Sequence, residues 1–193
     1  MDRMLNIKNY LEMMINTCNN IDYNEIIAIY EILVKTNDAG GKIYICGNGG
    51  SASTAQHFQA DLNKAFSIVR STMPAVCLND NLATITAIAN DVSYDDVFRY
   101  QLQYLLHEKD VLITISGSGN SVNIVKAAEY AKEKGNTVIA IVGYDGGKLK
   151  TLSDYVFLAA VNHMQVAEDI HLMFCHIVSV MIRESVEEIN DYC

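Results

Sequence analysis

Histidine and carboxylate residues occur twice at helical spacing in this chain. His57 and Asp61 lie four residues apart, one turn of a helix, and Glu168 and His176 lie eight residues apart, a little over two turns. An imidazole and a carboxylate on one face of a helix can take up and return a proton, which is the basis of general acid–base catalysis. Without context such a pair is more often a solvated surface pair, so only the motifs around it can indicate whether it belongs to a catalytic site.

A glycine-rich loop precedes the first pair. Residues 46–53 read CGNGGSAS and stand where a short apolar segment gives way to a helical pattern. The first turn of a helix offers unpaired N–H groups and a partial positive charge, and glycine lets a ligand approach the backbone closely. The expected contacts of an anionic ligand here are Asn48, Gly49, Gly50 and Ser51.

A second loop of the same kind spans residues 115–121 (ISGSGNS) and also separates a predicted strand from a predicted helix. In an open parallel sheet the ligand crevice lies at the carboxyl ends of the strands, so loops on neighbouring strands face the same cleft. Either loop alone could be a simple connector, whereas the two together favour a phosphorylated small molecule. Its expected contacts in this loop are Ser116, Gly117, Ser118 and Ser121.

The motifs and the net charge argue against several classes of ligand. Neither loop matches GxxxxGK[ST], and GNGGSA lacks the spacing of the dinucleotide fingerprint GxGxxG, so we expect no nucleotide cofactor. With 14 Lys and Arg against 23 Asp and Glu, the net charge of −9 disfavours binding to nucleic acid or anionic lipid. An anionic ligand must therefore be held by local groups.

The cysteines and the ends of the chain favour a cytoplasmic protein. The five cysteines are widely spaced and form no CxxC pair, so neither a disulfide framework nor a cysteine zinc site is indicated. The N-terminus lacks the apolar core of a signal peptide, and no apolar run approaches the roughly 20 residues that cross a membrane. We expect no membrane partner.

Short apolar runs alternate with helical patterns, which predicts an α/β fold with a doubly wound parallel sheet of about five strands flanked by helices. The strands are expected at residues 42–46, 75–78, 111–115, 137–142 and 155–159. The helices are expected at residues 51–64, 125–134 and 166–188, preceded by residues 7–35 as two helices or as one helix broken near Asn19 and Asn20.

The chain has no visible linker, and we expect a single domain over residues 1–193. Residues 1–36 form an N-terminal helical region, and residues 37–193 form the α/β core with the C-terminal helix. His171 lies on that largely apolar helix, and we interpret it as an interior histidine rather than a site residue.

The order of the motifs resembles the SIS (sugar isomerase) domain family. The shared features are GNGGSA at 47–52 followed by His57, the pair Asn90 and Asp91, ISGSGNS at 115–121, GYDGGKL at 143–149, and EDIH at 168–171. Within this family the chain is most similar to the phosphoheptose isomerases, which convert sedoheptulose 7-phosphate to D-glycero-D-manno-heptose 7-phosphate through an enediol. The resemblance covers nearly the whole chain.

The resemblance implies roles for individual residues. Asp61 and His176 correspond to the proton-transfer pair, and a zinc ion can be held by His57, Asp61, Glu168 and His176, a donor set that suits zinc. Further contacts to the sugar phosphate are implied for Asn90, Asp91, Gln165 and Glu168. The implied pathway is the synthesis of heptose for lipopolysaccharide or capsule.

Several positions depart from the pattern of that family. Asp61 stands where glutamate is usual, and Glu168 stands where the better-known members have glutamine. Gly117 replaces a threonine and Gln165 an aspartate, and an arginine expected shortly after the catalytic acid is missing, with residues 64–65 (KA) in its place. These departures leave the identity of the sugar open, whereas they do not affect the expected fold.

Two alternatives to a phosphoheptose isomerase remain open. The chain could isomerise another sugar phosphate, such as a hexose or pentose phosphate, or it could bind a phosphosugar or a protein as a non-catalytic regulator, as a similar family of tetramers that bind a replication initiator does. A regulator would have no need of His57, Asp61 and His176 together, which argues against that reading.

The N-terminal helical region also suggests an assembly. Similar proteins are homotetramers whose N-terminal and C-terminal helices build a central bundle, with sites near subunit boundaries. The alternative is a monomer in which one more helix covers the sheet.

Overall fold

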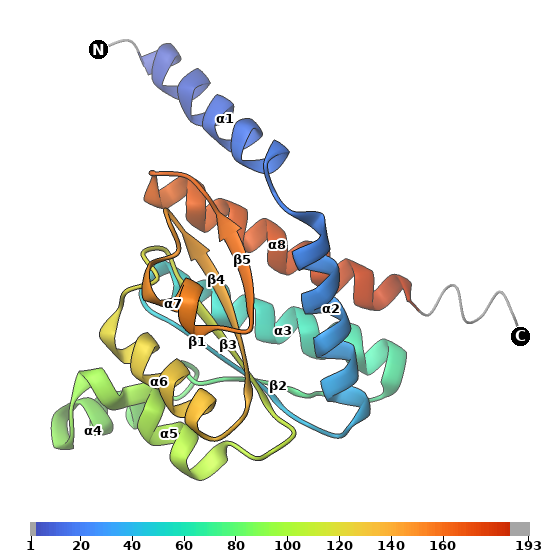
Figure 1. Cartoon of the computed structure of the whole chain (residues 1–193), viewed down its shortest axis with the longest axis vertical. Coiled ribbons are helices and arrows are strands. Elements are labelled where there is room, and N and C mark those ends of the chain that lie inside the picture. Colours follow the sequence, from blue (N-terminus) through green and yellow to red (C-terminus); the bar gives the residue numbers. More distant parts are fainter. Residues whose placement is uncertain (1–2, 186–193) are drawn as a thin grey trace, which may run out of the picture.

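Five parallel strands form the sheet, in the order β2-β1-β3-β4-β5 (Figure 1). The computed structural model describes residues 3–185. The strands are β1 (Ile43–Gly47), β2 (Ala75–Cys77), β3 (Val111–Ser116), β4 (Thr137–Gly143) and β5 (Tyr155–Ala159). Each lies within one residue of the segment predicted for it, so the α/β fold expected from the sequence is confirmed.

The helices alternate with the strands as predicted. They are α1 (Arg3–Asn19), α2 (Tyr23–Asp38), α3 (Gly50–Arg70), α4 (Leu82–Asp91), α5 (Val97–Leu105), α6 (Val122–Glu133), α7 (Gly147–Leu152) and α8 (Met164–Glu184), with a 3₁₀ turn, η1 (Tyr94–Asp96), before α5. Helices α4, α5 and α7 are not among the expected helices, and α3 ends six residues beyond the predicted residue 64. The N-terminal region is two helices, and the side chain of Asp22 caps the second by accepting from the N–H of Asn24. The predicted C-terminal end of the last helix, at 188, lies outside the described residues.

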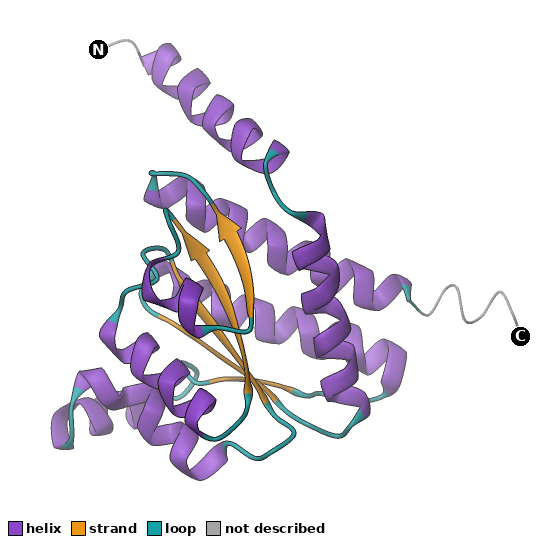
Figure 2. Cartoon of the chain, viewed as in Figure 1, coloured by secondary structure: helices purple, strands orange, loops and turns teal. Residues whose placement is uncertain are grey.

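The sheet is covered on both faces, which makes three layers (Figure 2). Ile43 and Ile45 of β1 belong to a core shared with α2, α3 and α8, whereas Tyr44 and Cys46 belong to a second core shared with α4, α5, α6 and α7. Both faces of the strand are therefore buried, which explains why it reads as an unbroken apolar run.

The point where the strand order reverses lies between β1 and β3. From β1 the chain passes through α3 to the edge strand β2, then returns to β3 on the other side of β1. Ligands of open α/β sheets bind at such a point, beyond the carboxyl ends of the strands. The two glycine-rich loops follow β1 and β3 and so stand side by side at this position.

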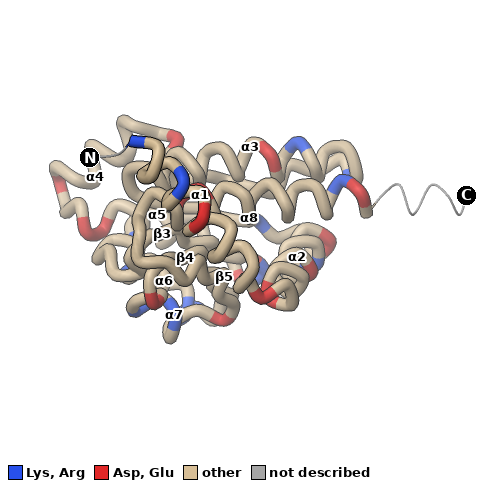
Figure 3. Tube along the Cα trace, turned by 90° about the horizontal axis from the view of Figure 1, so that it is seen from above, with Lys and Arg blue, Asp and Glu red and all other residues tan. Residues whose placement is uncertain are grey.

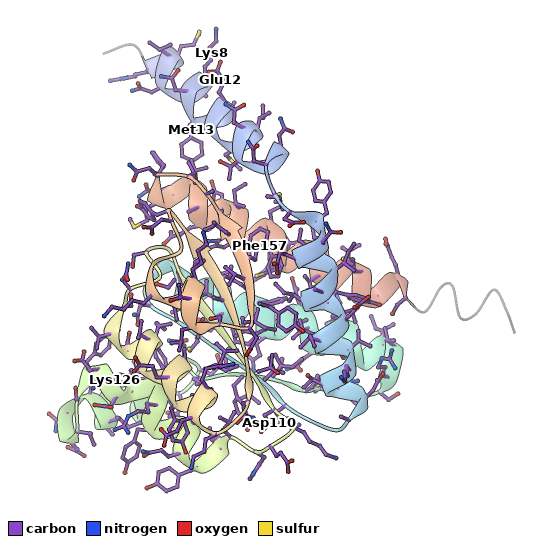
Figure 4. The ribbon with its side chains drawn as sticks, in the orientation of Figure 1. Lys8, Glu12, Met13, Asp110, Lys126 and Phe157 are labelled. Carbon is purple, nitrogen blue, oxygen red and sulfur yellow. The ribbon has the colours of Figure 1, made fainter. Side chains whose placement is uncertain are left out.

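Helix α8 is long and apolar enough to cross a membrane by length and composition, contrary to the prediction that no apolar run of the sequence approaches that length. Half of its apolar window is buried inside the fold. Phe174 stacks on Phe157 of β5, with ring centroids 4.3 Å apart, and Figure 4 shows Phe157 in the interior. Packing in the core accounts for the composition of α8.

Helix α1 extends beyond the body of the molecule and contacts it through α8 (Figure 1). The hydroxyl of Tyr10 donates to Asp169 at 2.6 Å, and its ring meets His163 edge-on. The hydrogen bond to this carboxylate raises the pKa of Tyr10 to about 12, so the phenol stays protonated and able to donate.

Candidate active site

His57, Asp61 and His176 meet in one cluster between α3 and α8, which run side by side (Figure 3). The two Nε2 atoms of His57 and His176 are 3.0 Å apart. The Oδ2 atom of Asp61 lies 3.2 Å from Nε2 of His57 and 3.8 Å from Nε2 of His176. The structure thus brings together the first predicted pair and the histidine of the second.

Core packing places these polar groups. Phe58 and Phe174 pack edge-on with ring centroids 6.3 Å apart, and both are fully buried. His57, Asp61 and His176 lie near these phenylalanines, on the outer side of the seam, the line along which α3 and α8 meet. Their side chains are 50%, 31% and 51% exposed, respectively. A small molecule can therefore reach all three groups from solvent.

The contacts of the cluster limit how its protons are arranged. Two Nε2 atoms 3.0 Å apart can form a hydrogen bond only if one donates and the other accepts. The carboxylate of Asp61 has no proton of its own to give when ionised and acts as an acceptor for His57. The cluster contains both a proton acceptor and a proton donor within one small volume.

Glu168 faces the same seam at a different level. A Cβ added to Gly50 would lie 2.7 and 2.9 Å from the two carboxylate oxygens of Glu168, so this carboxylate packs against the first turn of α3. His176 is eight residues farther along α8, about 12 Å along the axis. Within one chain Glu168 belongs to the glycine-rich loop and stands apart from the His57, Asp61 and His176 cluster.

The first glycine-rich loop begins α3 in a form suited to an anion. Gly49 has a φ of 54°, a conformation that glycine adopts at little cost, and among the described residues no side chain caps the helix. Ser51 is buried. A first turn that no side chain caps, together with the dipole of a 21-residue helix, could hold an anion, which is the role that the sequence predicts for this loop.

Asn48, predicted as a ligand contact, joins the first loop to the rest of the fold. Its amide forms two hydrogen bonds of 2.8 and 2.9 Å with the amide of Asn123 on α6, and the hydroxyl of Tyr94 donates to its oxygen at 3.0 Å. Sequence reasoning missed both partners, because neither carries a motif of its own. These bonds tie the loop after β1 to the helix after β3.

The second loop is braced by the loop that follows β4. Gly119 has a φ of 64°, and a Cβ there would lie 2.0 Å from the carbonyl oxygen of Gly146. The N–H of Gly143 donates to the carbonyl of Gly117, and the N–H of Leu149 donates to the carbonyl of Gly119. The GYDGGKL motif thus supports the second loop.

The serines of the second loop differ in what they can offer a ligand. Ser116 is buried and its hydroxyl accepts from the N–H of Gly119, so it shapes the turn. Ser118 is exposed and lines a cavity of about 570 Å³ with Asn120, Tyr144 and Asp145. Ser121 precedes α6, which has no side-chain cap among the described residues. Gly117 has open space where a Cβ would stand.

The remaining predicted contacts lie at the edge of this region. Asn90 and Asp91 end α4, are exposed, and hydrogen bond to each other at 2.7 Å. Gln165 is exposed in the first turn of α8. Their side chains are free to turn toward a ligand, and no contact in the described chain places them in the His57, Asp61 and His176 cluster.

A second cavity, of about 190 Å³, adjoins the cluster. Its lining comprises Asp61, Lys64, His176, Ser179, Val180 and Arg183. The sequence lacks the arginine expected after Asp61, but the structure brings a guanidinium to this place from α8. The helical spacing of Arg183 from His176, seven residues or about two turns, was the available signal.

His171 is fully buried, which confirms its interpretation as an interior histidine. Neither ring nitrogen has a hydrogen-bond partner within normal limits in the described part of the chain. Burial lowers the pKa of His171 to about 4, and the nearby carbonyl of Val142 offsets this only in part. The imidazole is therefore neutral at pH 7.

We expect this histidine to make the fold acid-sensitive. Between pH 6.5 and 4 the unfolded chain binds a proton at this residue and the folded chain does not, so stability rises with pH in that window and is lost as pH falls. The loss amounts to about 3 kcal/mol of unfolding free energy. Urea unfolding across pH 4 to 7 should show a flatter pH dependence for His171→Leu than for the wild type. His107→Leu, at an exposed histidine, is the control, and equal slopes in all three proteins would contradict the prediction.

Comparison with known proteins gives a consistent result. The SIS domain profile matches residues 7–143. The chain is 43% identical over 146 residues to a phosphoheptose isomerase of Helicobacter pylori strain P12, covering 76% of each, and 36% identical over 180 residues to a probable phosphoheptose isomerase of Thermoplasma volcanium, covering 93% of this chain and 92% of the relative. The structure of a phosphoheptose isomerase from Francisella tularensis superposes with a TM-score of 0.87 at 31% identity, over 95% of this chain and 100% of the other. The structure of the phosphoheptose isomerase from Neisseria gonorrhoeae superposes with a TM-score of 0.86 at 29% identity, over 94% of this chain and 96% of the other.

Proposed function

Because the chain belongs to the SIS domain family and resembles phosphoheptose isomerases over most of its length, we propose that it is an aldose–ketose isomerase that converts sedoheptulose 7-phosphate into D-glycero-D-manno-heptose 7-phosphate. The observation that carries this proposal is the His57, Asp61 and His176 cluster, two of whose members, His57 and Asp61, lie on the helix that begins at the glycine-rich loop.

The spacing along α3 suits a sugar of this length. Gly50 and His57 are seven residues apart, about 10 Å along the axis, and lie on the same line of the helix. Eight bonds separate C1 from the phosphorus of an extended heptulose 7-phosphate, and a chain of three bonds spans about 3.5 Å, so the molecule measures about 9 Å. With its phosphate at the loops, its reacting carbons come level with His57. The side chain of Asp61 reaches back to that level, since its Oδ2 atom lies 3.2 Å from Nε2 of His57.

In this proposal Asp61 and His176 carry out different steps of an enediol isomerisation. Asp61 takes the proton from C1 of the ketose, the C–H electron pair forms the C1–C2 double bond, and the carbonyl electrons move to O2. His176 exchanges protons with the two oxygens, and the proton returned to C2 completes the aldose. The substrate is neither oxidised nor reduced overall, so no redox cofactor is needed.

The two loops hold the phosphate in this proposal. The N–H groups at the starts of α3 and α6 and the hydroxyls of Ser118 and Ser121 are the donors, with Ser51 and Ser116 shaping the turns. Asn90, Asp91, Gln165 and Glu168 are assigned to the sugar hydroxyls. Asn48 holds the first loop in place through Asn123.

The cluster also has the donors for a zinc ion. The three ligand atoms lie within 4.8 Å of one another, and ligands of a tetrahedral zinc at about 2.0–2.1 Å stand roughly 3.3 Å apart. His57, Asp61 and His176 would hold the ion, and Glu168 would have to turn away from Gly50 to join them. When bound, zinc would polarise the substrate carbonyl as a Lewis acid.

The test is an NMR assay with sedoheptulose 7-phosphate in D2O, run with added zinc and after chelation. We expect heptose 7-phosphate that carries deuterium at C2. Binding of the ketose without product or exchange would contradict the proposal and favour a regulator, whereas turnover of a hexose or pentose phosphate alone would change the substrate and keep the chemistry.

We also propose a homotetramer, because α1 has an apolar stripe that the single chain leaves in solvent. Ile7, Leu11 and Ile15 recur every four residues on this helix and are 62%, 52% and 60% exposed. A further apolar cavity of about 390 Å³ lies between Cys18, Ile27 and Met181, where α1 and α2 meet α8. A second copy of these helices would bury both surfaces.

A charge on this stripe should dissociate the assembly. Burial of a leucine is worth about 1.5–3 kcal/mol, so Leu11→Glu should raise the dissociation constant at least about tenfold. Light scattering after size exclusion should then give a smaller mass than for the wild type. Leu82→Glu, at a leucine 73% exposed on α4, is the control and should leave the mass unchanged. An unaltered mass for Leu11→Glu would exclude α1 from the interface.

We assign the enzyme to the cytoplasm, where phosphorylated sugars are made and kept. The described cysteines are free thiols, which suits a reducing compartment. The proposed pathway is the supply of heptose for lipopolysaccharide or capsule.

A further inference from the structure

The cavity beside Asp61 and His176 has two cations in its wall. Lys64 of α3 and Arg183 of α8 line the same space of about 190 Å³ as the two proposed catalytic side chains. The chain as a whole has a net charge of −9, so two positive groups at one small cavity are a local exception.

Helical geometry places both cations in line with the cluster. Lys64 follows Asp61 by three residues on α3, and Arg183 follows His176 by seven residues on α8, so each lies on the same helix face as its neighbour. Ala65 and Ile182, next to them in sequence, are buried in the core. The packing of α3 against α8 therefore keeps the two long side chains at the edge of the seam.

The charges of Lys64 and Arg183 are not neutralised within the described chain. The carboxylate of Asp61 interacts with His57 and His176, and neither cation has a carboxylate within ion-pair distance among residues 3–185. The hydroxyl of Ser179 is occupied by the carbonyl of Cys175 at 2.8 Å, and Val180 has no polar side-chain group. Apart from His176, Lys64 and Arg183 are thus the donors that this wall can offer to a ligand.

We propose that Lys64 and Arg183 stabilise the enediolate oxygen of the isomerisation, an inference that rests on the proposed function. Removal of the C1 proton by Asp61 places a negative charge on O2, which is absent from the bound ketose. Fixed positive charges beside the reacting carbons lower the energy of this intermediate more than that of the substrate, and so raise kcat. No further reactant is required.

The alternative role for these cations, binding the substrate phosphate, fits the geometry less well. The phosphate site built from the starts of α3 and α6 lies near Gly50, whose backbone is about 16 Å along α3 from the backbone of Asp61 and about 21 Å from that of Lys64. The substrate has a single phosphate, and when that phosphate is bound near Gly50 none is left to interact with Lys64 and Arg183. The oxygens of the reacting end are the only negative charge that develops near them.

The test compares Arg183→Gln and Lys64→Gln with the wild-type protein and with Lys134→Gln. Lys134 lies at the end of α6, on the face of the sheet opposite to α3 and α8, and its replacement makes the same change in charge. We expect each cavity variant to lower kcat about 100-fold and to leave KM within about threefold, because one charge acts on the intermediate and not on the substrate. Arg183→Ala should regain activity with added guanidinium, and Arg183→Lys should keep more activity than Arg183→Gln.

The outcomes separate this inference from the proposed function. If the wild type neither isomerises the ketose phosphate nor exchanges its proton, the proposed function fails and this inference with it. If the wild type turns over and the cavity variants keep its kcat, or change only KM, the inference alone is overturned. Equal thermal unfolding of all variants will show that a loss of kcat reflects the site rather than the fold.

Discussion

Replacing Asp61 with asparagine is expected to lower kcat about 1,000-fold or more while the protein folds as before. The amide has nearly the same shape but cannot accept a proton from C1, and a positioned base contributes about 10² to 10⁴ to such a rate. Asp61 is 31% exposed, so the loss of its charge leaves no buried group unpaired. The measurements are steady-state kinetics and exchange of the C1 proton into D2O, since the exchange reports proton removal directly.

Two further variants test whether the loss of kcat comes from the missing carboxylate at position 61. Asp22→Asn makes the same chemical change at the N-cap of α2, where asparagine caps as well as aspartate, and should leave activity unchanged. Asp61→Glu keeps a carboxylate on a chain longer by one methylene and should retain more activity than the asparagine variant. Zinc content measured on each protein separates loss of a metal ligand from loss of a base. If Asp61→Asn stays within tenfold of the wild type, the base is another residue, and Glu168 becomes the first candidate.

The fold could be predicted because each strand and helix is specified by residues that are neighbours in sequence. The central strands β1, β3 and β4 are buried on both faces and the edge strands β2 and β5 partly so, which is why each strand appears as a short run of apolar residues. These runs are followed by glycine or polar residues. The break near Asn20 is equally local, since Asp22 supplies the cap that begins a new helix. These features depend on neighbours in sequence and need no knowledge of the tertiary structure.

The site was predictable only in part, because its assembly depends on how helices distant in sequence pack. Glu168 and His176 are eight residues apart, which on a helix of 3.6 residues per turn separates them by about 80° and 12 Å. Spacing could place both on α8 but could not show that Glu168 meets Gly50 while His176 meets His57. Arg183 is missed for the same reason, since only the packing of α8 on α3 brings it to Asp61.

The contacts of the first glycine-rich loop also depend on residues that are distant in sequence. Asn48 belongs to a recognisable motif, but its partners Asn123 and Tyr94 come from α6 and η1 and carry no motif. The resemblance to a family identifies residues that contact substrate more readily than residues that hold those contacts in place. The latter have to be read from the structure.

Replacing Gly119 with alanine is expected to disrupt the second loop and to raise KM for the sugar phosphate at least about tenfold. The new Cβ would lie 2.0 Å from the carbonyl oxygen of Gly146, a backbone atom that cannot move aside by rotating a side chain. The loop must then separate from the one after β4, and the hydrogen bond from Leu149 to the carbonyl of Gly119 is lost. Ser118 and Ser121 lose their common orientation, so the phosphate is held less well, and isothermal titration with inorganic phosphate should show the same loss as KM.

Gly135 provides the matched control for that substitution. Its φ of 82° resembles the 64° of Gly119, but nothing lies within 4 Å of a Cβ built there, and it stands at the turn between α6 and β4, away from the loops. Gly135→Ala therefore carries only the cost of a left-handed alanine, about 1–2 kcal/mol, which lowers Tm by about 2–8 °C in a domain of this size. It should leave KM unchanged. Gly119→Ala adds the clash to the same backbone cost, so the difference between the two variants measures what the contact between the loops contributes to phosphate binding. Equal KM values in both would mean that the phosphate is held at the start of α3 alone, without help from the loop after β3.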